Sequence, residues 1–146
     1  QKEYFEKQLN IAKKFNMPVV IHTREATEDT YEILKKYNLK GVLHCYSGSL
    51  EMAKLYLNMG YMFGIGGVLT FKNSKLKDVV KELPLQNLVL ETDSPYLAPE
   101  PKRGSVNEPK NIKIIANCLA KVKEISLNEV TNVTTDNAKR LFDLIH

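Results

Sequence analysis

The sequence predicts an α/β fold built on a parallel sheet, and three observations lead to this expectation. Helical and strand patterns alternate along the chain. The strand-like runs, such as Val19–Ile21 and Leu88–Leu90, are apolar without alternating, which is typical of strands covered on both faces. The four expected strands begin near positions 19, 42, 61 and 88, a spacing close to the roughly 30 residues per unit of a (β/α)8 barrel.

The number of strands predicts a partial barrel. A closed barrel of this type needs about 250 residues, so 146 residues with four strands supply about half of one. We therefore expect residues 1–146 to form a single partial domain, with helices flanking four parallel strands. The alternative is an open four-stranded parallel sheet, which the alternation alone does not exclude. The start at Gln1, without an initiator Met, suggests a chain that begins inside a larger unit.

The elements before the last strand each carry a local signal. The first helix has apolar residues three to four positions apart, Thr27 is a candidate N-cap for the second, and Ser49 can cap the third. Ser74 begins a fourth helix, which Pro84 interrupts. The expected order is helix 2–15, strand 19–21, helix 27–37, strand 41–43, helix 49–60, strand 61–66, helix 74–83 and strand 88–90.

A long loop and further helices are expected after the fourth strand. Residues 94–108 contain three prolines and a glycine, and Pro109 is suited to open a helix whose apolar stripe extends to Val122. Ser126–Glu129 has the pattern of a capping box. We expect two short helices to complete the chain, the last one holding Ala138 and Leu141.

The composition is that of a globular protein, with 43% hydrophobic and 26% charged residues. No apolar run approaches the roughly 18 residues that a membrane span needs, so no membrane partner is expected. The formal net charge of +4 suits a polyanionic partner, although the lysines are dispersed as on a solvated surface. Cys45 and Cys118 form no spacing motif and are expected to be free thiols in a reducing compartment, the cytoplasm.

Polar residues follow three of the expected strands directly. His22 ends one strand and His44 the next, while the fourth runs into Glu91 and Asp93. Ligands and catalytic residues gather at this end of parallel strands, and imidazoles with a carboxylate suit Zn²⁺ or Mn²⁺. Because side chains alternate along a strand, both acids should point to one side, with Asp93 as ligand and general base and Glu91 orienting it or a histidine.

Two arginines are candidates for holding phosphate oxygens above this site. Arg24 lies two residues past His22, and Arg103 lies in the long loop beside Lys102. The glycines at 64, 66 and 67 lack the third glycine of a dinucleotide loop, and close backbone approach in a barrel strand explains them. His44 and Cys45 are adjacent and should face opposite sides, which excludes a direct Cys-His pair.

These motifs together resemble the TatD family of metal-dependent deoxyribonucleases, within the amidohydrolase-like hydrolases. The resemblance covers essentially the whole chain. The matching stretches are 18–24, 44–48, 64–67, 91–97, 101–109 and 137–142.

The resemblance implies the C-terminal half of a (β/α)8 TIM-type barrel, roughly strands five to eight, with a centre of two divalent ions (Mg²⁺, Mn²⁺ or Zn²⁺). His22 and His44 would bind one ion and Asp93 the other, while Asp93 acts on the attacking water. The implied substrate is DNA, single-stranded or at 3′ ends, with Tyr46 or Phe71 as possible stacking surfaces for bases. The family's remaining ligands belong to the missing N-terminal half, so this chain alone is expected to be inactive or nearly so.

Two other functions remain open from the sequence. One is a different amidohydrolase-type metal hydrolase that cleaves C–N or lactone bonds. The other is a non-catalytic fragment that binds metal or nucleic acid, which the absence of further ligands favours.

Overall fold

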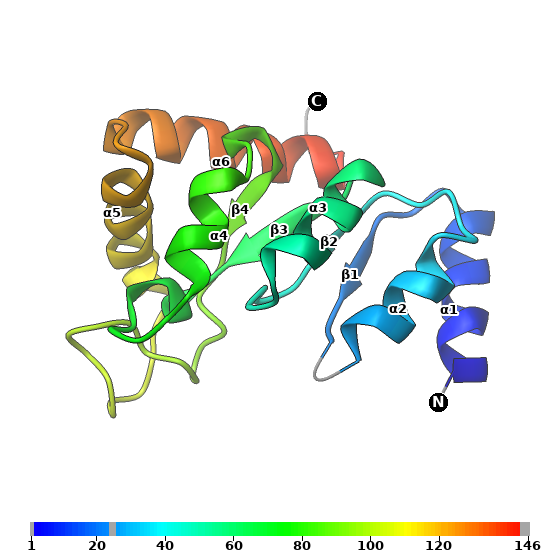
Figure 1. Ribbon diagram of the computed structural model, residues 1–146, viewed down its shortest axis with the longest axis horizontal. Coiled ribbons are helices and arrows are strands. Elements are labelled where there is room, and N and C mark those ends of the chain that lie inside the picture. Colours follow the sequence, from blue (N-terminus) through cyan, green and yellow to red (C-terminus); the bar gives the residue numbers. More distant parts are fainter. Residues whose placement is uncertain (1, 24–25, 144–146) are drawn as a thin grey trace.

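The computed structural model describes residues 2–23 and 26–143 (Figure 1). Helices and strands alternate as the sequence predicts, with three 3₁₀ turns (η1–η3) between them. The elements are α1 (Lys2–Lys14), β1 (Val19–Ile21), α2 (Thr27–Leu34), β2 (Gly41–Leu43), α3 (Leu50–Asn58), β3 (Met62–Ile65), η1 (Gly67–Thr70), α4 (Leu76–Glu82), η2 (Leu85–Asn87), β4 (Leu88–Leu90), η3 (Pro109–Asn111), α5 (Ile112–Lys123) and α6 (Leu127–Phe142).

The four strands form one parallel sheet in the order β1-β2-β3-β4. Val20 pairs with Val42, and Phe63 pairs with Leu88. A doubly wound sheet reverses its strand order at a switch point, whereas a barrel adds each strand beside the previous one. The consecutive order is the one expected for half of a barrel. Within the described chain, one side of β1 and one side of β4 have no neighbouring strand.

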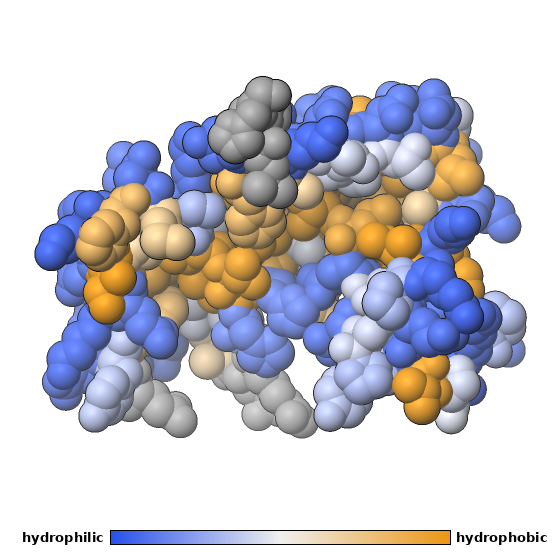
Figure 2. Space-filling view, turned by 180° about the vertical axis from the view of Figure 1, so that it is seen from behind, coloured by the Kyte–Doolittle hydropathy of each residue, from blue (hydrophilic) through white to orange (hydrophobic). Residues whose placement is uncertain are grey.

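The sheet separates two apolar clusters of unequal size. Leu43, Phe63 and Leu88 belong to the main core, which also contains buried residues of the helices. Their strand neighbours form a smaller cluster with Leu141 of α6, namely Val42, Met62 and Val89. Seen from behind, hydrophobic side chains gather in a band across the middle of the molecule, between polar margins (Figure 2). β2, β3 and β4 are apolar on both faces because both of their faces are packed, whereas Val20 of β1 is 58% exposed.

Two of the three predicted helix caps are confirmed. Ser49 Oγ accepts a hydrogen bond from Met52 N (3.2 Å) at the start of α3. Ser126 Oγ accepts one from Glu129 N (3.0 Å) at the start of α6. The assignment of Thr27 as a cap is wrong. Ala26 occupies that position and makes no side-chain bond, so α2 begins with Thr27.

The prediction of two short helices at the end of the chain is wrong, because α6 is a single helix of 16 residues. Its buried positions Val130, Thr134, Asn137 and Leu141 recur at helical spacing along one continuous stripe. Thr134 Oγ1 also donates to Val130 O (2.8 Å), which satisfies its hydroxyl inside the helix. No helix in the described ranges is long and apolar enough to cross a membrane.

Candidate metal centre

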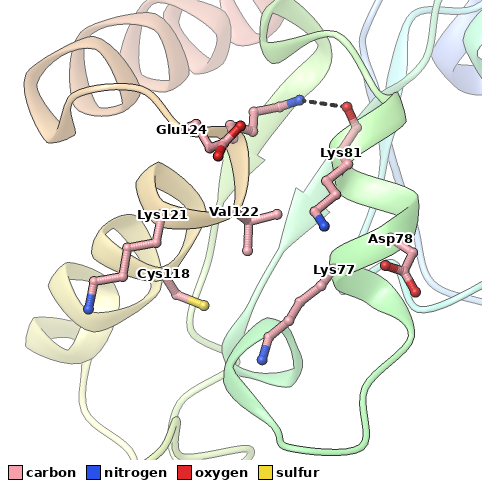
Figure 3. Close-up of a pocket in the computed structure, with 8 residues that line it drawn as sticks. Lys77, Asp78, Lys81, Cys118, Lys121, Val122 and Glu124 are labelled. Atoms are coloured by element: carbon pink, nitrogen blue, oxygen red, sulfur yellow. Dashed lines mark hydrogen bonds between the residues drawn. The ribbon is translucent and has the colours of Figure 1, made fainter.

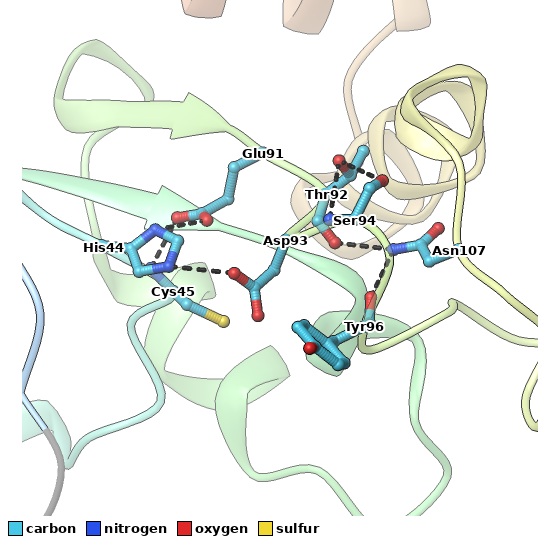
Figure 4. Close-up of polar contacts among 8 residues, drawn as sticks. All are labelled: His44, Cys45, Glu91, Thr92, Asp93, Ser94, Tyr96 and Asn107. Carbon is cyan, nitrogen blue, oxygen red and sulfur yellow. Dashed lines mark hydrogen bonds and ion pairs between the residues drawn. The ribbon is translucent and has the colours of Figure 1, made fainter.

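His44, Glu91 and Asp93 meet at the carboxyl ends of β2 and β4 (Figure 4). His44 Nδ1 lies 2.6 Å from Glu91 Oε2, and His44 Nε2 lies 3.2 Å from Asp93 Oδ1. The two acids point to the same side of the strand, as their alternation predicts. One potential ligand atom from each of the three residues lies within 4.8 Å of the others. We call these three residues the carboxylate–histidine cluster.

Glu91 is held from two directions besides the histidine. Its Oε1 accepts a hydrogen bond from Cys45 N (2.5 Å). The same oxygen occupies the space that a Cβ atom at Gly64 would need, so β3 must carry glycine there. Burial raises the pKa of the Glu91 carboxyl, while the Cys45 N–H bond and nearby His44 oppose the rise. The Glu91 carboxylate is therefore held in one position, where it can accept a hydrogen bond from the His44 imidazole.

The backbone turns sharply at both strand ends that carry the cluster. Cys45 has a φ of 49° and Asp93 a φ of 55°, in the left-handed region that L-residues rarely adopt. Such conformations gather at functional sites, where the surrounding structure holds them. Burial, together with the charges of Glu91 and Asp93, raises the pKa of the Cys45 thiol to about 11. The thiol therefore stays protonated near neutral pH and is no nucleophile.

The contacts of His44 call for a positive charge beside Nε2. The short contact with Glu91 assigns a proton to Nδ1, because a carboxylate can only accept. In a neutral ring, Nε2 then has a lone pair that faces the Asp93 carboxylate. Two acceptors 3.2 Å apart require a proton or a cation between or beside them. The geometry is that of a histidine oriented by one carboxylate toward an ion, as in carboxylate–histidine–metal triads.

His22 lies beside the cluster but outside it. Its ring centroid is 5.5 Å from that of His44, with the planes inclined by 38°. His22 is exposed at the end of β1 and is not among the ligand atoms that converge. In its place, the described residues bring in Glu91, which the sequence assigned to an orienting role. Arg24, the predicted phosphate contact, lies outside the described residues.

The loop after β4 is anchored by Asn107, a residue to which the sequence assigned no role. Its side chain is 3% exposed. Asn107 Nδ2 donates to Thr92 O and Tyr96 O (2.7 Å each), and its Oδ1 accepts from Glu108 N and Asn111 Nδ2 (2.9 Å each). This anchoring places the Tyr96 ring beside the Asp93 carboxylate, with Tyr96 71% exposed (Figure 4). The signal that could have identified Asn107 was its place two residues before Pro109, at the end of the proline-containing loop.

Of the two aromatic residues considered for base stacking, Tyr46 is buried. Its ring packs edge-on against Phe63, and its hydroxyl donates to Ser49 O (2.6 Å). The stacking surface predicted at Tyr46 is therefore wrong. Phe71 lies near the surface, but the Arg103 guanidinium covers one face of its ring, 3.7 Å from the centroid.

A separate hollow of about 750 Å³ lies between α4 and α5, in the helix layer (Figure 3). Lys77, Lys81 and Lys121 line it, together with the half-buried Cys118. Lys123 Nζ donates to Leu83 O (2.6 Å), so this lysine caps the end of α4. None of the cluster residues lines this hollow, which sets it apart from the candidate metal centre.

Comparisons with known proteins agree with this geometry. The family described as TatD related DNase matches residues 1–143. A Bacillus subtilis protein named uncharacterized metal-dependent hydrolase YabD is 46% identical over 146 residues, which cover 97% of this chain and 57% of the relative. The Escherichia coli K12 protein named uncharacterized metal-dependent hydrolase YcfH is 40% identical over 148 residues, covering 99% of this chain and 56% of the relative.

Two solved structures share the fold. The crystal structure of YjjV, a TatD homolog from Escherichia coli K12, superposes with a TM-score of 0.89 at 31% identity, covering 94% of this chain and 54% of that one. A TatD family protein from Entamoeba histolytica gives 0.82 at 27% identity, covering 94% and 55%. The chain spans about half the length of the curated relatives that it matches. It belongs to the TatD family of metal-dependent hydrolases and has the strand order of about half of their barrel.

Proposed function

We propose that the protein containing this chain is a metal-dependent phosphodiesterase that shortens DNA, acting on single strands or 3′ ends. The observation that carries the proposal is the convergence of His44, Glu91 and Asp93, whose potential ligand atoms lie within 4.8 Å of one another, with His44 Nε2 3.2 Å from Asp93 Oδ1. The family description as a DNase supports DNA as the substrate. The names of the relatives support metal-dependent hydrolysis without specifying the bond.

The donor set of the carboxylate–histidine cluster fits a divalent ion. One imidazole and two carboxylates are ligands that Zn²⁺, Mn²⁺ and Mg²⁺ accept to different degrees. His44 Nε2 and Asp93 would hold the ion, and His22 is near enough to His44 to take part after a small movement. An ion held there would polarise the phosphoryl oxygen and stabilise the developing negative charge.

The chain's own side chains have separate tasks in this proposal. Glu91 holds the Nδ1 proton of His44, so that Nε2 keeps its lone pair toward the site. Asp93, at the rim, takes a proton from the attacking water. Arg103 lies on the loop that follows Asp93 and contacts a phosphate of the substrate. Asn107 keeps that loop in place.

A second ion needs ligands that the described residues do not bring together. The carboxylate–histidine cluster is the one group of three potential ligands found in residues 2–23 and 26–143. We propose that a further segment, with the four remaining strands of the barrel, supplies the other ligands. The share of the relatives that this chain covers, 56 to 57%, supports the existence of such a segment.

The two cysteines support a cytoplasmic location. Cys45 and Cys118 are both free thiols. Free thiols persist in reducing compartments.

The test is hydrolysis of 3′-labelled single-stranded DNA with added Mg²⁺, Mn²⁺ or Zn²⁺, by this chain alone and by the protein extended with the preceding segment of its own gene. We expect cleavage by the extended protein, little by the chain alone, and a loss of about 10²- to 10⁴-fold in Asp93→Asn. Asp78→Asn, on the helix layer, is the matched control and should retain activity. Turnover of cyclic amides without DNA cleavage would contradict the proposal.

A further inference from the structure

A groove lies at the same end of the sheet as the carboxylate–histidine cluster, between the segment after β3 and the loop after β4. Its volume is about 730 Å³. The two segments are joined by a hydrogen bond from Glu100 N to Thr70 Oγ1 (2.8 Å), and Gly67 packs closely against Leu97 O. We call it the rim groove. Its lining residues are Val68, Phe71, Lys72, Asn73, Ser74, Glu100, Arg103 and Gly104.

Arg103 is oriented in the rim groove without using its hydrogen-bond donors. The centre of its guanidinium lies 3.7 Å from the Phe71 ring centroid. Among the described residues, no carboxylate lies within 4.0 Å of the guanidinium nitrogens, and no acceptor is bonded to them. The neighbouring Lys102 differs, because its Nζ donates to Asn111 Oδ1 (3.0 Å). Stacking thus fixes the plane of a cation whose donors remain open.

The other polar side chains of the rim groove also favour an anion. Lys72 is exposed and makes no ion pair or hydrogen bond within the described ranges, and the Asn73 amide is likewise unbonded there. Glu100 is the single acid in the lining, against two cations. A planar guanidinium with an ammonium nearby suits the oxygens of a phosphodiester, which accept bidentate bonds.

The same stacking covers one face of the Phe71 ring with the Arg103 guanidinium, and a nucleobase cannot stack on that face. The rim groove and the cluster share no residue, so each can contact a different part of one strand.

We propose that the rim groove is a second phosphate-binding site, which holds a backbone phosphate of single-stranded DNA away from the bond that is cleaved. Arg103 binds the phosphate oxygens in the orientation set by Phe71, and Lys72 and Asn73 complete the contact. The inference rests on the proposed function for its choice of ligand, because the same chemistry would accept other phosphodiesters.

The experiment is equilibrium binding of a short fluorescein-labelled single-stranded oligonucleotide to the full 146-residue chain, followed by anisotropy over a range of salt concentrations. EDTA is present, so that neither metal binding nor cleavage contributes. We expect Arg103→Ala to weaken binding about tenfold and Lys72→Ala about threefold, with the slope against salt falling by about 1 for each. Arg103→Lys keeps the charge without the planar donors and should give an intermediate loss.

Two further variants make the result specific to the rim groove. Lys75→Ala removes an exposed lysine three residues from Lys72 that does not line the groove, and it should bind as the unsubstituted chain does. Phe71→Leu should weaken binding by less than Arg103→Ala does, because it releases the guanidinium from its fixed orientation but keeps its charge and its donors. If Phe71→Leu does not fold, Arg103→Lys tests the same point.

Equal binding by Arg103→Ala and the unsubstituted chain would overturn the inference, as would no binding by the unsubstituted chain at low salt. The proposed DNA hydrolysis is tested by a different result from the one that tests the rim groove. Weaker binding by Arg103→Ala together with no cleavage by the extended protein would retain the rim groove and reject the phosphodiesterase.

Discussion

Gly64 and Glu91 fit together at the centre of the candidate metal site. A Cβ at Gly64 would overlap Glu91 Oε1, whereas a Cβ at Gly66 would meet Glu91 Cγ at 3.6 Å and Cys45 Sγ at 3.8 Å, ordinary contacts. Neither glycine needs a positive φ. Alanine at position 64 must therefore displace the carboxylate that orients His44, while alanine at position 66 need not.

We predict that Gly64→Ala lowers the free energy of unfolding by about 1 to 3 kcal/mol and weakens Zn²⁺ or Mn²⁺ binding by about 10- to 100-fold. Urea unfolding and calorimetric titration of the metal measure the two effects. Gly66→Ala is the matched control and should change both only slightly. If the two variants behave alike, Glu91 does not position His44 through the space at Gly64.

Two buried tyrosines give a second matched pair. Tyr61 Oη has no hydrogen-bond partner among the described residues, whereas Tyr56 Oη donates to Thr27 O (2.9 Å). Burial raises the pKa of Tyr61 to about 12. Between the ordinary pKa of about 10 and this value, the unfolded chain releases the phenol proton before the folded chain does. The contribution of Tyr61 therefore makes the free energy of unfolding fall as the pH rises from about 10 to about 12.

We predict that Tyr61→Phe leaves the free energy of unfolding at pH 7 unchanged or raises it by about 1 kcal/mol, because a buried unsatisfied hydroxyl is removed. Tyr56→Phe should lower it by about 1 kcal/mol. Tyr61→Phe should also lose less stability than the unsubstituted chain between pH 10 and 12. Urea denaturation at several pH values measures these differences, and a destabilised Tyr61→Phe at pH 7 would contradict the argument.

The strands and the loops differ in how far the sequence predicts them. Apolar runs that end in His44 and Asp93 locate two strand ends, and alternation places Glu91 on the same side as Asp93. The path of residues 94–108 could not be predicted, because Asn107 fixes it through the backbone atoms of Thr92 and Tyr96. The positions of these backbone atoms depend on how the loop itself folds, and no periodic pattern of apolar residues predicts them. Tyr96 and the rim groove follow from that path and were missed for the same reason.

We predict that Asn107→Ala releases this loop while the sheet stays folded. The change leaves buried carbonyl and N–H groups without partners and should lower the free energy of unfolding by about 1 to 3 kcal/mol. Amide hydrogen exchange should accelerate within residues 94–106 more than in the strands. Asn117→Ala, which removes one exposed hydrogen bond to Lys113 O (2.8 Å), is the control. Uniform acceleration over the whole chain would contradict a local anchoring role.

At the scale of the whole molecule, the sheet has open sides at β1 and β4. Val19 N donates to Lys40 O (3.0 Å), and Ile21 O accepts from His44 N (2.8 Å), so both residues direct their backbone groups to the β2 side. By alternation, the N–H and C=O of Val20 face the open side. Val20 is also 58% exposed. Exposed strand edges with apolar side chains pair readily with other strands.

We predict that the isolated chain self-associates through these edges, and that Val20→Lys raises the dissociation constant about tenfold, since a charged edge residue opposes strand pairing. Sedimentation velocity over a concentration series measures the association. Leu55→Lys is the matched control, because Leu55 is a partly exposed apolar residue of α3 at 38% and lies away from both open edges. A monomeric unsubstituted chain, or an equal effect of the two lysines, would show that the edges do not drive association. A chain that forms monomers only after the preceding segment is restored would show that the segment covers β1 and β4.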